Sequence, residues 1–243
     1  MIVLAALALA IAAPQAAPAA PVAALVDPAR KARGIELARM LNSEALTRIQ
    51  LDKMLGETMP ALIATDPDFK AMEAEYPGIT KAMIDAMRGI LVEEVLQSLP
   101  ELWDKIGTVY AEELTVADLD AVLAFFRSTS GARLAESVAR EGDLSQLLKT
   151  MIADDKETVT ETALRNQVRA SATKAMGKLN AEDRSALINF GWSPAGVKLR
   201  TANARIMPIA TAWSNRSSPQ SDAKMEKAMA EVVEKFMRED DRK

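Results

Sequence analysis

Residues 114–140 read LTVADLDAVLAFFRSTSGARLAESVAR, and residues 179–205 read LNAEDRSALINFGWSPAGVKLRTANAR. At this fixed offset of 65 residues, nine of the 27 aligned positions are identical. Each copy contains a helix-capping residue, an amphipathic segment, and then Ser and Gly three positions apart. Repetition of a whole helix-turn-helix unit predicts a duplicated scaffold. We therefore expect an all-α helical bundle built around two tandem helix-turn-helix repeats.

The first helix of each copy has the same predicted start. Thr115 and Asn180 are residue types that cap helix N-termini, and Asp118 and Asp183 follow three positions later. A carboxylate at that position accepts a backbone N–H and faces the positive end of the helix dipole. These four residues are predicted to be structural.

The second helix of each copy begins after a serine. Ser128 and Ser193 are predicted N-caps, and Pro194 suits the first turn that follows. Gly131 and Gly196 come three positions after the serines, where glycine costs about 1 kcal/mol relative to alanine. Repeated glycine at an unfavourable place predicts close approach of the preceding helix.

Phe125 and Phe190 lie on the predicted buried side of the first helix, and they open the segments FFRSTSGAR and FGWSPAGVK. These segments resemble the Phe-Tyr-x-Ser-Pro-x-Gly-x-Lys signature of the domain of unknown function 2059 family. The first copy has Thr129 where the signature has Pro, and the second has Gly191 where it has Tyr. The resemblance implies a helical, secreted or periplasmic protein of unassigned activity. It implies no catalytic residue.

The composition restricts both fold and chemistry. The 243 residues are 49% hydrophobic but only 4% aromatic, with ten glycines, which favours helices. A net charge of -4 with interleaved Lys and Arg gives no basic face for nucleic acid. The absence of Cys and His excludes disulfides, thiol catalysis, a Ser-His-Asp triad and the usual zinc or haem ligands. We expect no enzyme activity, no cofactor and no metal.

The N-terminus indicates export. Residues 2–13 form an uncharged apolar run, followed by the proline and small-residue stretch PQAAPAAP at 14–21. This pattern is typical of a signal peptide, although no Lys or Arg precedes the run. A membrane anchor is the alternative, but its prolines interrupt the roughly 20 apolar residues that a span requires. We expect a signal peptide at 1–20, no stable membrane span after cleavage, and a periplasmic or secreted bacterial protein.

The remaining chain divides into three predicted parts. These are an N-terminal helical hairpin at 27–77, a duplicated helical core at 78–213, and a C-terminal amphipathic helix at 221–239. Pro60 is expected to kink or end a helix, Pro100 to break one, and Pro208 to mark a restart. Residues 144–178 are expected to form one or two long helices.

Three chemical alternatives compete with structural interpretations. Ser128 and Ser193 resemble nucleophiles, but capping explains them better because no His or Ser-x-x-Lys accompanies them. The acid pairs Glu93–Glu94 and Asp154–Asp155 suggest glycoside hydrolysis or cation binding, but adjacent helical residues do not share a face. The 13 methionines suggest copper(I) or a ligand groove, and are interpreted as adaptable core residues.

These patterns favour an exported, non-enzymatic protein that binds another protein or envelope component. One alternative is a carrier that holds an apolar small molecule or lipid in an inter-helical groove. A hydrolase that uses only carboxylates is the third hypothesis, and it requires convergent buried acids.

Overall fold

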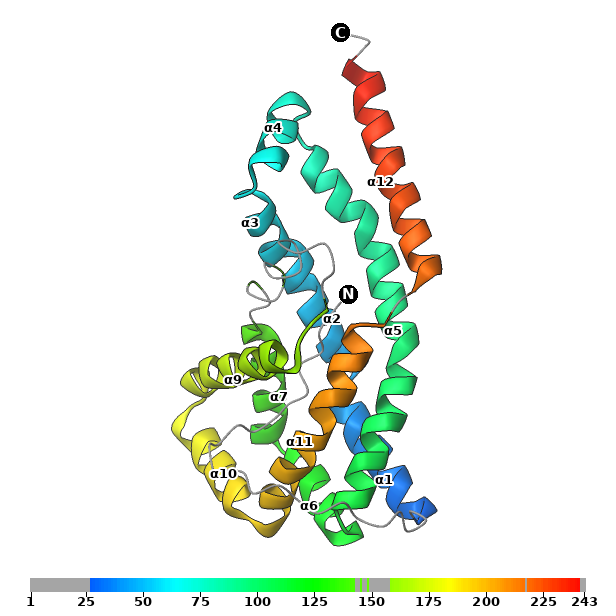
Figure 1. Ribbon diagram of the computed structural model, residues 1–243. Coiled ribbons are helices and arrows are strands. Elements are labelled where there is room, and N and C mark those ends of the chain that lie inside the picture. The colour runs from blue at the N-terminus through cyan, green and yellow to red at the C-terminus, as the bar shows by residue number, and fades with distance from the viewer. Residues whose placement is uncertain (1–26, 143–144, 146–147, 149–157, 217, 241–243) are drawn as a thin grey trace.

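The computed structural model describes residues 27–142, 145, 148, 158–216 and 218–240, and this part of the chain is all-α (Figure 1). The predicted fold class is thereby confirmed at the level of an all-α protein. The predicted signal peptide at 1–20 lies outside the described residues. The helices are α1 (Pro28–Leu41), α2 (Glu44–Lys53), the π-helical turn η1 (Met54–Thr58), α3 (Met59–Ile63), α4 (Pro67–Glu75), α5 (Ile79–Glu113), α6 (Val116–Arg127), α7 (Thr129–Glu141), α9 (Glu161–Lys178), α10 (Ala181–Trp192), α11 (Pro194–Ser214) and α12 (Pro219–Asp240).

Helix α5 is the long axis of the molecule. Its 35 residues span about 50 Å at 1.5 Å per residue, and α1, α11 and α12 all pack against it (Figure 1). Its buried side chains include Leu99, Leu102, Ile106 and Tyr110, which belong to one hydrophobic core that extends from α1 to α11. Helices α2, α3 and α4 also pack against α5, whereas α7 packs against α2, α6, α9 and α10.

Helix α1 crosses α5 at a contact between two glycines. A Cβ atom on Gly34 would overlap the carbonyl oxygen of Gly107, and one on Gly107 would lie 2.6 Å from the Cα atom of Ile35. Real Cβ atoms keep at least 3.0 Å from such neighbours. The backbones of α1 and α5 therefore meet at a distance that only glycine permits.

The expected helix break at Pro100 is wrong, and so is the expected restart at Pro208. Helix α5 continues through Pro100, and α11 continues through Pro208. Both prolines are exposed, whereas Leu99, Leu102 and Met207 beside them are buried. The hydrogen bond that each proline removes thus lies on the solvent side, where water can satisfy the freed carbonyl, while packing of the opposite face maintains the helix.

The chain reverses direction between α3 and α5, so α3 and α4 lie beside the start of α5. After α2, the chain continues through η1 and α3 past Pro60, so the helical segment ends at Ile63. Asp66 then caps α4, and Gly78 with a φ of 92° makes the turn into α5. Only glycine adopts this left-handed conformation without strain, so Gly78 fixes the angle between α4 and α5.

The C-terminal helix α12 begins at Pro219, two residues before the predicted start. It lies along the amino-terminal part of α5, on the right in Figure 1. Its predicted apolar stripe is half-buried at Met225, Val233 and Phe236, whereas Met237 is exposed. The apolar stripe of α12 thus packs on α5 of the same chain.

Within the predicted helical stretch at 144–178, the described helix is α9, which Thr160 caps. Residues 149–157 lie outside the described part, including the acid pair at 154 and 155. Among the described helices, none combines the length and apolar character that crossing a membrane requires.

Candidate functional site

We call residues 114–140 unit 1 and residues 179–205 unit 2, and we call residues 65 positions apart counterparts. Both units start their first helix with the expected N-cap side chain, but only in unit 1 does the aspartate accept the backbone N–H of the cap. The Thr115 hydroxyl accepts the Asp118 N–H at 3.2 Å, and the Asp118 carboxylate accepts the Thr115 N–H at 3.0 Å. The Asn180 side chain accepts the Asp183 N–H at 2.8 Å. These bonds satisfy backbone donors that a helix start leaves free.

The two candidate serines serve the helix starts. Ser128 accepts the Gly131 N–H at 3.2 Å, and Ser193 accepts the Gly196 N–H at 3.1 Å. Each hydroxyl also donates to the backbone carbonyl three residues earlier, at 2.6 Å for the first and 2.7 Å for the second. Pro194 follows the second cap in the first helical turn. Both hydroxyls therefore join the end of one helix to the start of the next.

The glycines that follow lie against the preceding helix. A Cβ atom on Gly131 would overlap the carbonyl oxygen of Phe125, and one on Gly196 would overlap that of Phe190. Both positions are far inside the 3.0 Å limit of real Cβ contacts, and the neighbour is backbone. This close approach explains why each unit keeps glycine where another residue would be a better helix former.

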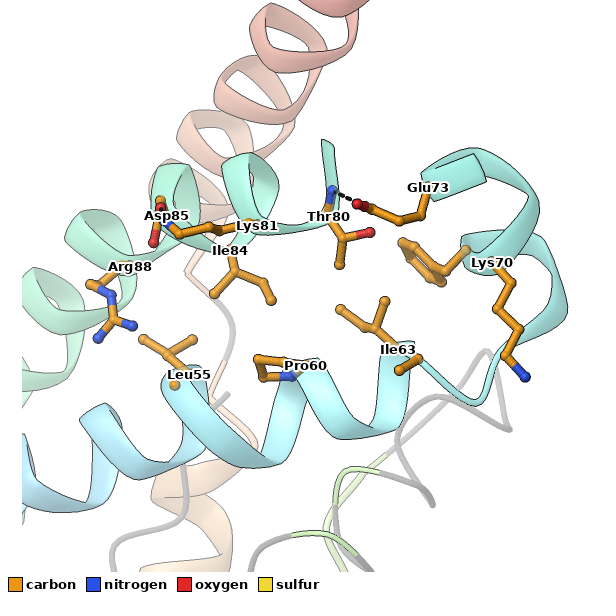
Figure 2. Close-up of a pocket in the computed structure, with 13 residues that line it drawn as sticks. Leu55, Pro60, Ile63, Lys70, Glu73, Thr80, Lys81, Ile84, Asp85 and Arg88 are labelled. Atoms are coloured by element: carbon orange, nitrogen blue, oxygen red, sulfur yellow. Dashed lines mark hydrogen bonds and ion pairs between the residues drawn. The ribbon is translucent and has the colours of Figure 1, made fainter. Parts of the chain in front are cut away.

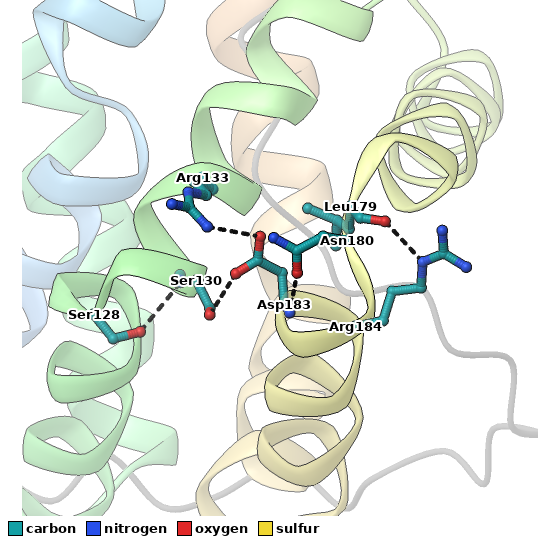
Figure 3. Close-up of polar contacts among 8 residues, drawn as sticks. Ser128, Ser130, Arg133, Leu179, Asn180, Asp183 and Arg184 are labelled. Atoms are coloured by element: carbon teal, nitrogen blue, oxygen red, sulfur yellow. Dashed lines mark hydrogen bonds and ion pairs between the residues drawn. The ribbon is translucent and has the colours of Figure 1, made fainter.

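Ion pairs join the two units in a reciprocal way. Arg133 of unit 1 contacts the Asp183 carboxylate of unit 2 at 3.3 Å, as Figure 3 shows. Lys198, the counterpart of Arg133, contacts the Asp118 carboxylate of unit 1 at 2.6 Å. The Ser130 hydroxyl also donates a hydrogen bond to the Asp183 carboxylate at 2.6 Å (Figure 3). Each unit thus supplies the cation for the carboxylate of the other.

An aromatic stack also joins the two units. The rings of Phe125 and Phe190 are parallel within 3°, with their centroids 4.0 Å apart. Phe126 meets the Phe190 ring edge-on at 6.0 Å. Offset or edge-on aromatic contacts add about 1 kcal/mol to the burial of the rings. Two counterpart residues therefore contact each other directly.

The two carboxylates of these ion pairs are held in the charged form. Burial raises the pKa of Asp118, but hydrogen bonds from Lys198 and Thr115 outweigh it and lower the pKa overall. The hydrogen bond from Ser130 lowers the pKa of Asp183, and Arg133 lowers it further. A general acid needs the opposite shift. Together, the two ion pairs and the aromatic stack form the contact between units 1 and 2, which we call the joint.

A cavity of about 550 Å³ lies between α3, α4 and the start of α5 (Figure 2). Leu55, Pro60, Ile63 and Ile84 point into it from the two sides. Its size is within the range of small-molecule sites, and its walls are mainly apolar.

Charged side chains also line this cavity. Arg88 pairs with Asp52 at 3.0 Å outside the cavity, and Lys81 pairs with Asp85. Lys70 also lines the cavity, and it forms no ion pair with any described residue.

Glu73, which also lines the cavity, is held by backbone donors. Its carboxylate accepts the N–H of Gly78 at 2.6 Å and the N–H of Thr80 at 3.1 Å. These hydrogen bonds lower the pKa of Glu73, the bond from Gly78 most of all. Glu73 thus stabilises the α4–α5 turn as an anion.

Large apolar side chains are exposed on α9 and α10. Trp192 is 74% exposed, Ile188 is 48% exposed, and Met176 is 39% exposed. The other two tryptophans each donate an indole N–H, Trp103 to Asn42 at 2.9 Å and Trp213 to Ser98 at 3.4 Å. We name Met176, Ile188 and Trp192 the α9–α10 face.

The remaining sequence candidates do not converge on the cavity. Glu93 accepts a hydrogen bond from Gln97, whereas Glu94 lies 3.7 Å from Arg216. Met83 is buried in the core, and neither it nor Met87 lines the cavity. Over the described ranges, no group of three or more Asp, Glu, Cys or His side chains has a metal-binding arrangement.

The sequence did not predict that Lys70 lines a cavity. It also did not predict that Arg133 pairs with Asp183 or that Lys198 pairs with Asp118, because the two residues of each pair are far apart in the sequence and no local pattern links them. Comparison with protein-family models, curated proteins and solved structures found no match.

Proposed function

We propose that the protein is an exported, non-catalytic binding protein, in which two tandem helix-turn-helix repeats form a rigid scaffold for another envelope macromolecule. Export rests on the signal-peptide pattern of residues 1–20. Membership in the domain of unknown function 2059 family is part of this proposal, and it rests on the two copies of the signature motif.

The duplication is supported by the contacts between units 1 and 2. Phe125 stacks on its counterpart Phe190, and the Asp118–Lys198 and Asp183–Arg133 pairs are exchanged between units. A residue meets its own counterpart only near a local twofold axis, and the neighbouring contacts are then reciprocal.

The observation that carries the binding function is the α9–α10 face. Monomeric proteins expose single apolar residues routinely, whereas neighbouring exposed apolar side chains that form a patch favour an interaction site. Trp192 and Ile188 lie one helical turn apart on α10. Tryptophan is also among the residues that contribute most to binding energy at interfaces.

Affinity capture from intact bacterial envelopes tests the proposal. The wild-type protein is compared with a Trp192→Ser, Ile188→Ser double variant and with a matched Val116→Ser control, which removes an exposed apolar residue from unit 1. We expect the same partner with wild type and control, and loss of at least tenfold with the double variant. Capture of the same amount of partner by the double variant and by the wild-type protein contradicts the proposal. Turnover of generic esters, peptides or glycans also contradicts it.

The cavity between α3, α4 and α5 favours a second candidate function, transport of an apolar molecule with an anionic end. Its apolar walls suit a hydrocarbon chain, and Lys70, which lines the cavity, forms no ion pair with a described residue. Dodecanoic acid is therefore expected to bind better than its methyl ester, and Lys70→Glu to remove that preference. Lys178→Glu, an exposed change on α9, is the matched control. Equal binding of acid and ester contradicts the assignment.

A further inference from the structure

We propose that the α9–α10 face binds an amphipathic α-helix with acidic flanks, in the place on unit 2 that corresponds to the place of α1 beside unit 1. This inference rests on the proposed binding function and names the chemistry of the partner. It follows from a comparison of counterpart residues, in which α1 is the template.

Helix α1 packs on both α5 and α6. Its sequence PARKARGIELARML carries four basic residues and one acidic residue. Lys31 pairs with Asp104 of α5 at 2.9 Å, and Arg33 pairs with Asp120 of α6 at 2.7 Å. A basic helix thus lies between acidic side chains on two adjoining helices.

The apolar residues beside α1 have exposed counterparts. Ala111 lies at the α1–α5 crossing and is 0% exposed, while its counterpart Met176 is exposed on α9. Leu123 of α6 is 2% exposed, while its counterpart Ile188 is exposed on α10. These two positions are therefore buried on α5 and α6 but open on α9 and α10.

Trp192 extends the same open region. Its counterpart Arg127 forms an ion pair with Glu36 of α1, so this position faces the docked helix in unit 1. An indole in that position offers a large rigid contact to a helix and cannot replace the ion pair. The face of unit 2 is thus more apolar at this end.

Arginines on α9 and α10 stand in place of one acidic and one apolar residue, whereas Asp120, which pairs with Arg33, has the neutral Ser185 as its counterpart. Asp104 has Arg169 as its counterpart, and the buried Leu119 has Arg184. Neither arginine forms an ion pair with a described residue, and the Arg184 guanidinium donates to the Leu179 carbonyl at 2.9 Å. Acidic residues beside unit 1 receive the basic α1, so a basic border beside unit 2 fits a helix with acidic flanks.

This charge pattern disfavours a second copy of the chain. A symmetric dimer through this face would bring two copies of Arg169 and Arg184 into one interface and no additional acidic side chain from α1. Like charges placed together at an interface oppose association. Trp192 with arginines nearby also suits an anionic lipid surface, but the correspondence with a helix-binding position favours a helix.

Two peptides provide the probe. One is the α1 sequence of residues 28–41, and the other is the same peptide with Lys31→Glu and Arg33→Glu. Both are held helical by a lactam bridge on the outer face, because free helices of this length are only marginally stable in water. The protein is labelled with ¹⁵N, and titration is followed at the three tryptophan indole signals.

We expect the acidic peptide to bind at least tenfold more tightly than the basic one, with the largest shift at the Trp192 indole. Trp103 and Trp213 serve as internal references because their indole groups already donate to backbone carbonyls. The Arg169→Glu, Arg184→Glu variant should reverse the preference. Arg48→Glu, which changes an exposed arginine on α2, should leave it intact.

Equal affinity for both peptides overturns the inference, as does a preference that survives in the Arg169→Glu, Arg184→Glu variant. Self-association that buries Trp192, or binding to phosphatidylglycerol vesicles without binding to either peptide, also overturns it. If neither peptide binds but envelope capture still depends on Trp192 and Ile188, the proposed function stands and the acidic-helix assignment fails.

Discussion

Units 1 and 2 have the same turn between their two helices and different outer faces. In both, a capped helix ends at a serine, and a glycine then brings the next helix against the backbone of the first. On the outside, unit 1 lies beside α1, whereas unit 2 exposes Ile188 and Trp192. The comparison therefore distinguishes residues that hold the helices together from residues that face solvent or a neighbouring helix. The capping serine and the glycine of this turn are the same in both units, whereas Ile188 and Trp192 on the exposed face differ from their counterparts Leu123 and Arg127.

The largest effect is expected at the shared glycines. Gly131→Ala and Gly196→Ala should each lower the free energy of unfolding by about 3 kcal/mol, because the added methyl group meets a backbone carbonyl. Denaturant unfolding measures the change. Gly89→Ala is the control, since nothing lies within 4 Å of its Cβ position, and it should stabilise α5 by up to about 1 kcal/mol. Tolerance of alanine at Gly131 or Gly196 would contradict the close helix contact.

A smaller effect is expected where unit 2 has a buried amide. Neither side-chain polar atom of Asn203 has a hydrogen-bond partner among the described residues, and its counterpart is the buried Val138. Asn203→Val should therefore raise the free energy of unfolding by about 1–2 kcal/mol, since an unpaired buried amide is costly. Thermal and denaturant unfolding should agree. A loss of stability would mean that unit 2 differs from unit 1 in the core as well.

The reciprocal ion pairs should contribute less. Asp118→Asn and Asp183→Asn should each cost about 1 kcal/mol, because Lys198 and Arg133 remain about half exposed and solvent screens the pairs. The two losses should be similar if the units are equivalent. A large loss for one and none for the other would break the comparison.

The same pairs predict the smallest effect, an acid dependence of stability. Both carboxylates have a lowered pKa in the folded protein, so their stabilisation is complete above the ordinary aspartate pKa of about 4. It is lost as pH falls through the lowered pKa values. Unfolding of wild type and of the Asp118→Asn, Asp183→Asn variant should differ at pH 7 and converge towards pH 2. A constant difference would exclude these groups as its source.

The helix starts could be predicted because their causes are local. Thr115 and Asp118 lie three residues apart, as do Ser193 and Gly196, so capping and close approach are readable from spacing. The Arg133–Asp183 pair joins residues 50 positions apart and has no such signal. Pro100 was predicted to break a helix because its chemistry is local, but packing of the buried side of α5 prevailed.

Exposure of the α9–α10 face could not be predicted from its residues. Ile188 has the same type of side chain as the buried Leu123, and the spacing of both suits a core. Helix α1 packs on α6, which carries Leu123, whereas no described helix packs on α10 in the corresponding place. The neighbours of a helix, which come from elsewhere in the chain, decide whether its apolar residues belong to the core or to a surface.

Paired unfolding of Leu123→Ala and Ile188→Ala tests this account most directly. The two variants truncate counterpart side chains, so the intrinsic helix propensities of the substitutions are similar. We expect Leu123→Ala to lower the free energy of unfolding by about 2–5 kcal/mol, as for a buried leucine, and Ile188→Ala to change it by less than about 0.5 kcal/mol. Equal losses in the two variants would contradict the claim that one scaffold presents a closed face and an open one.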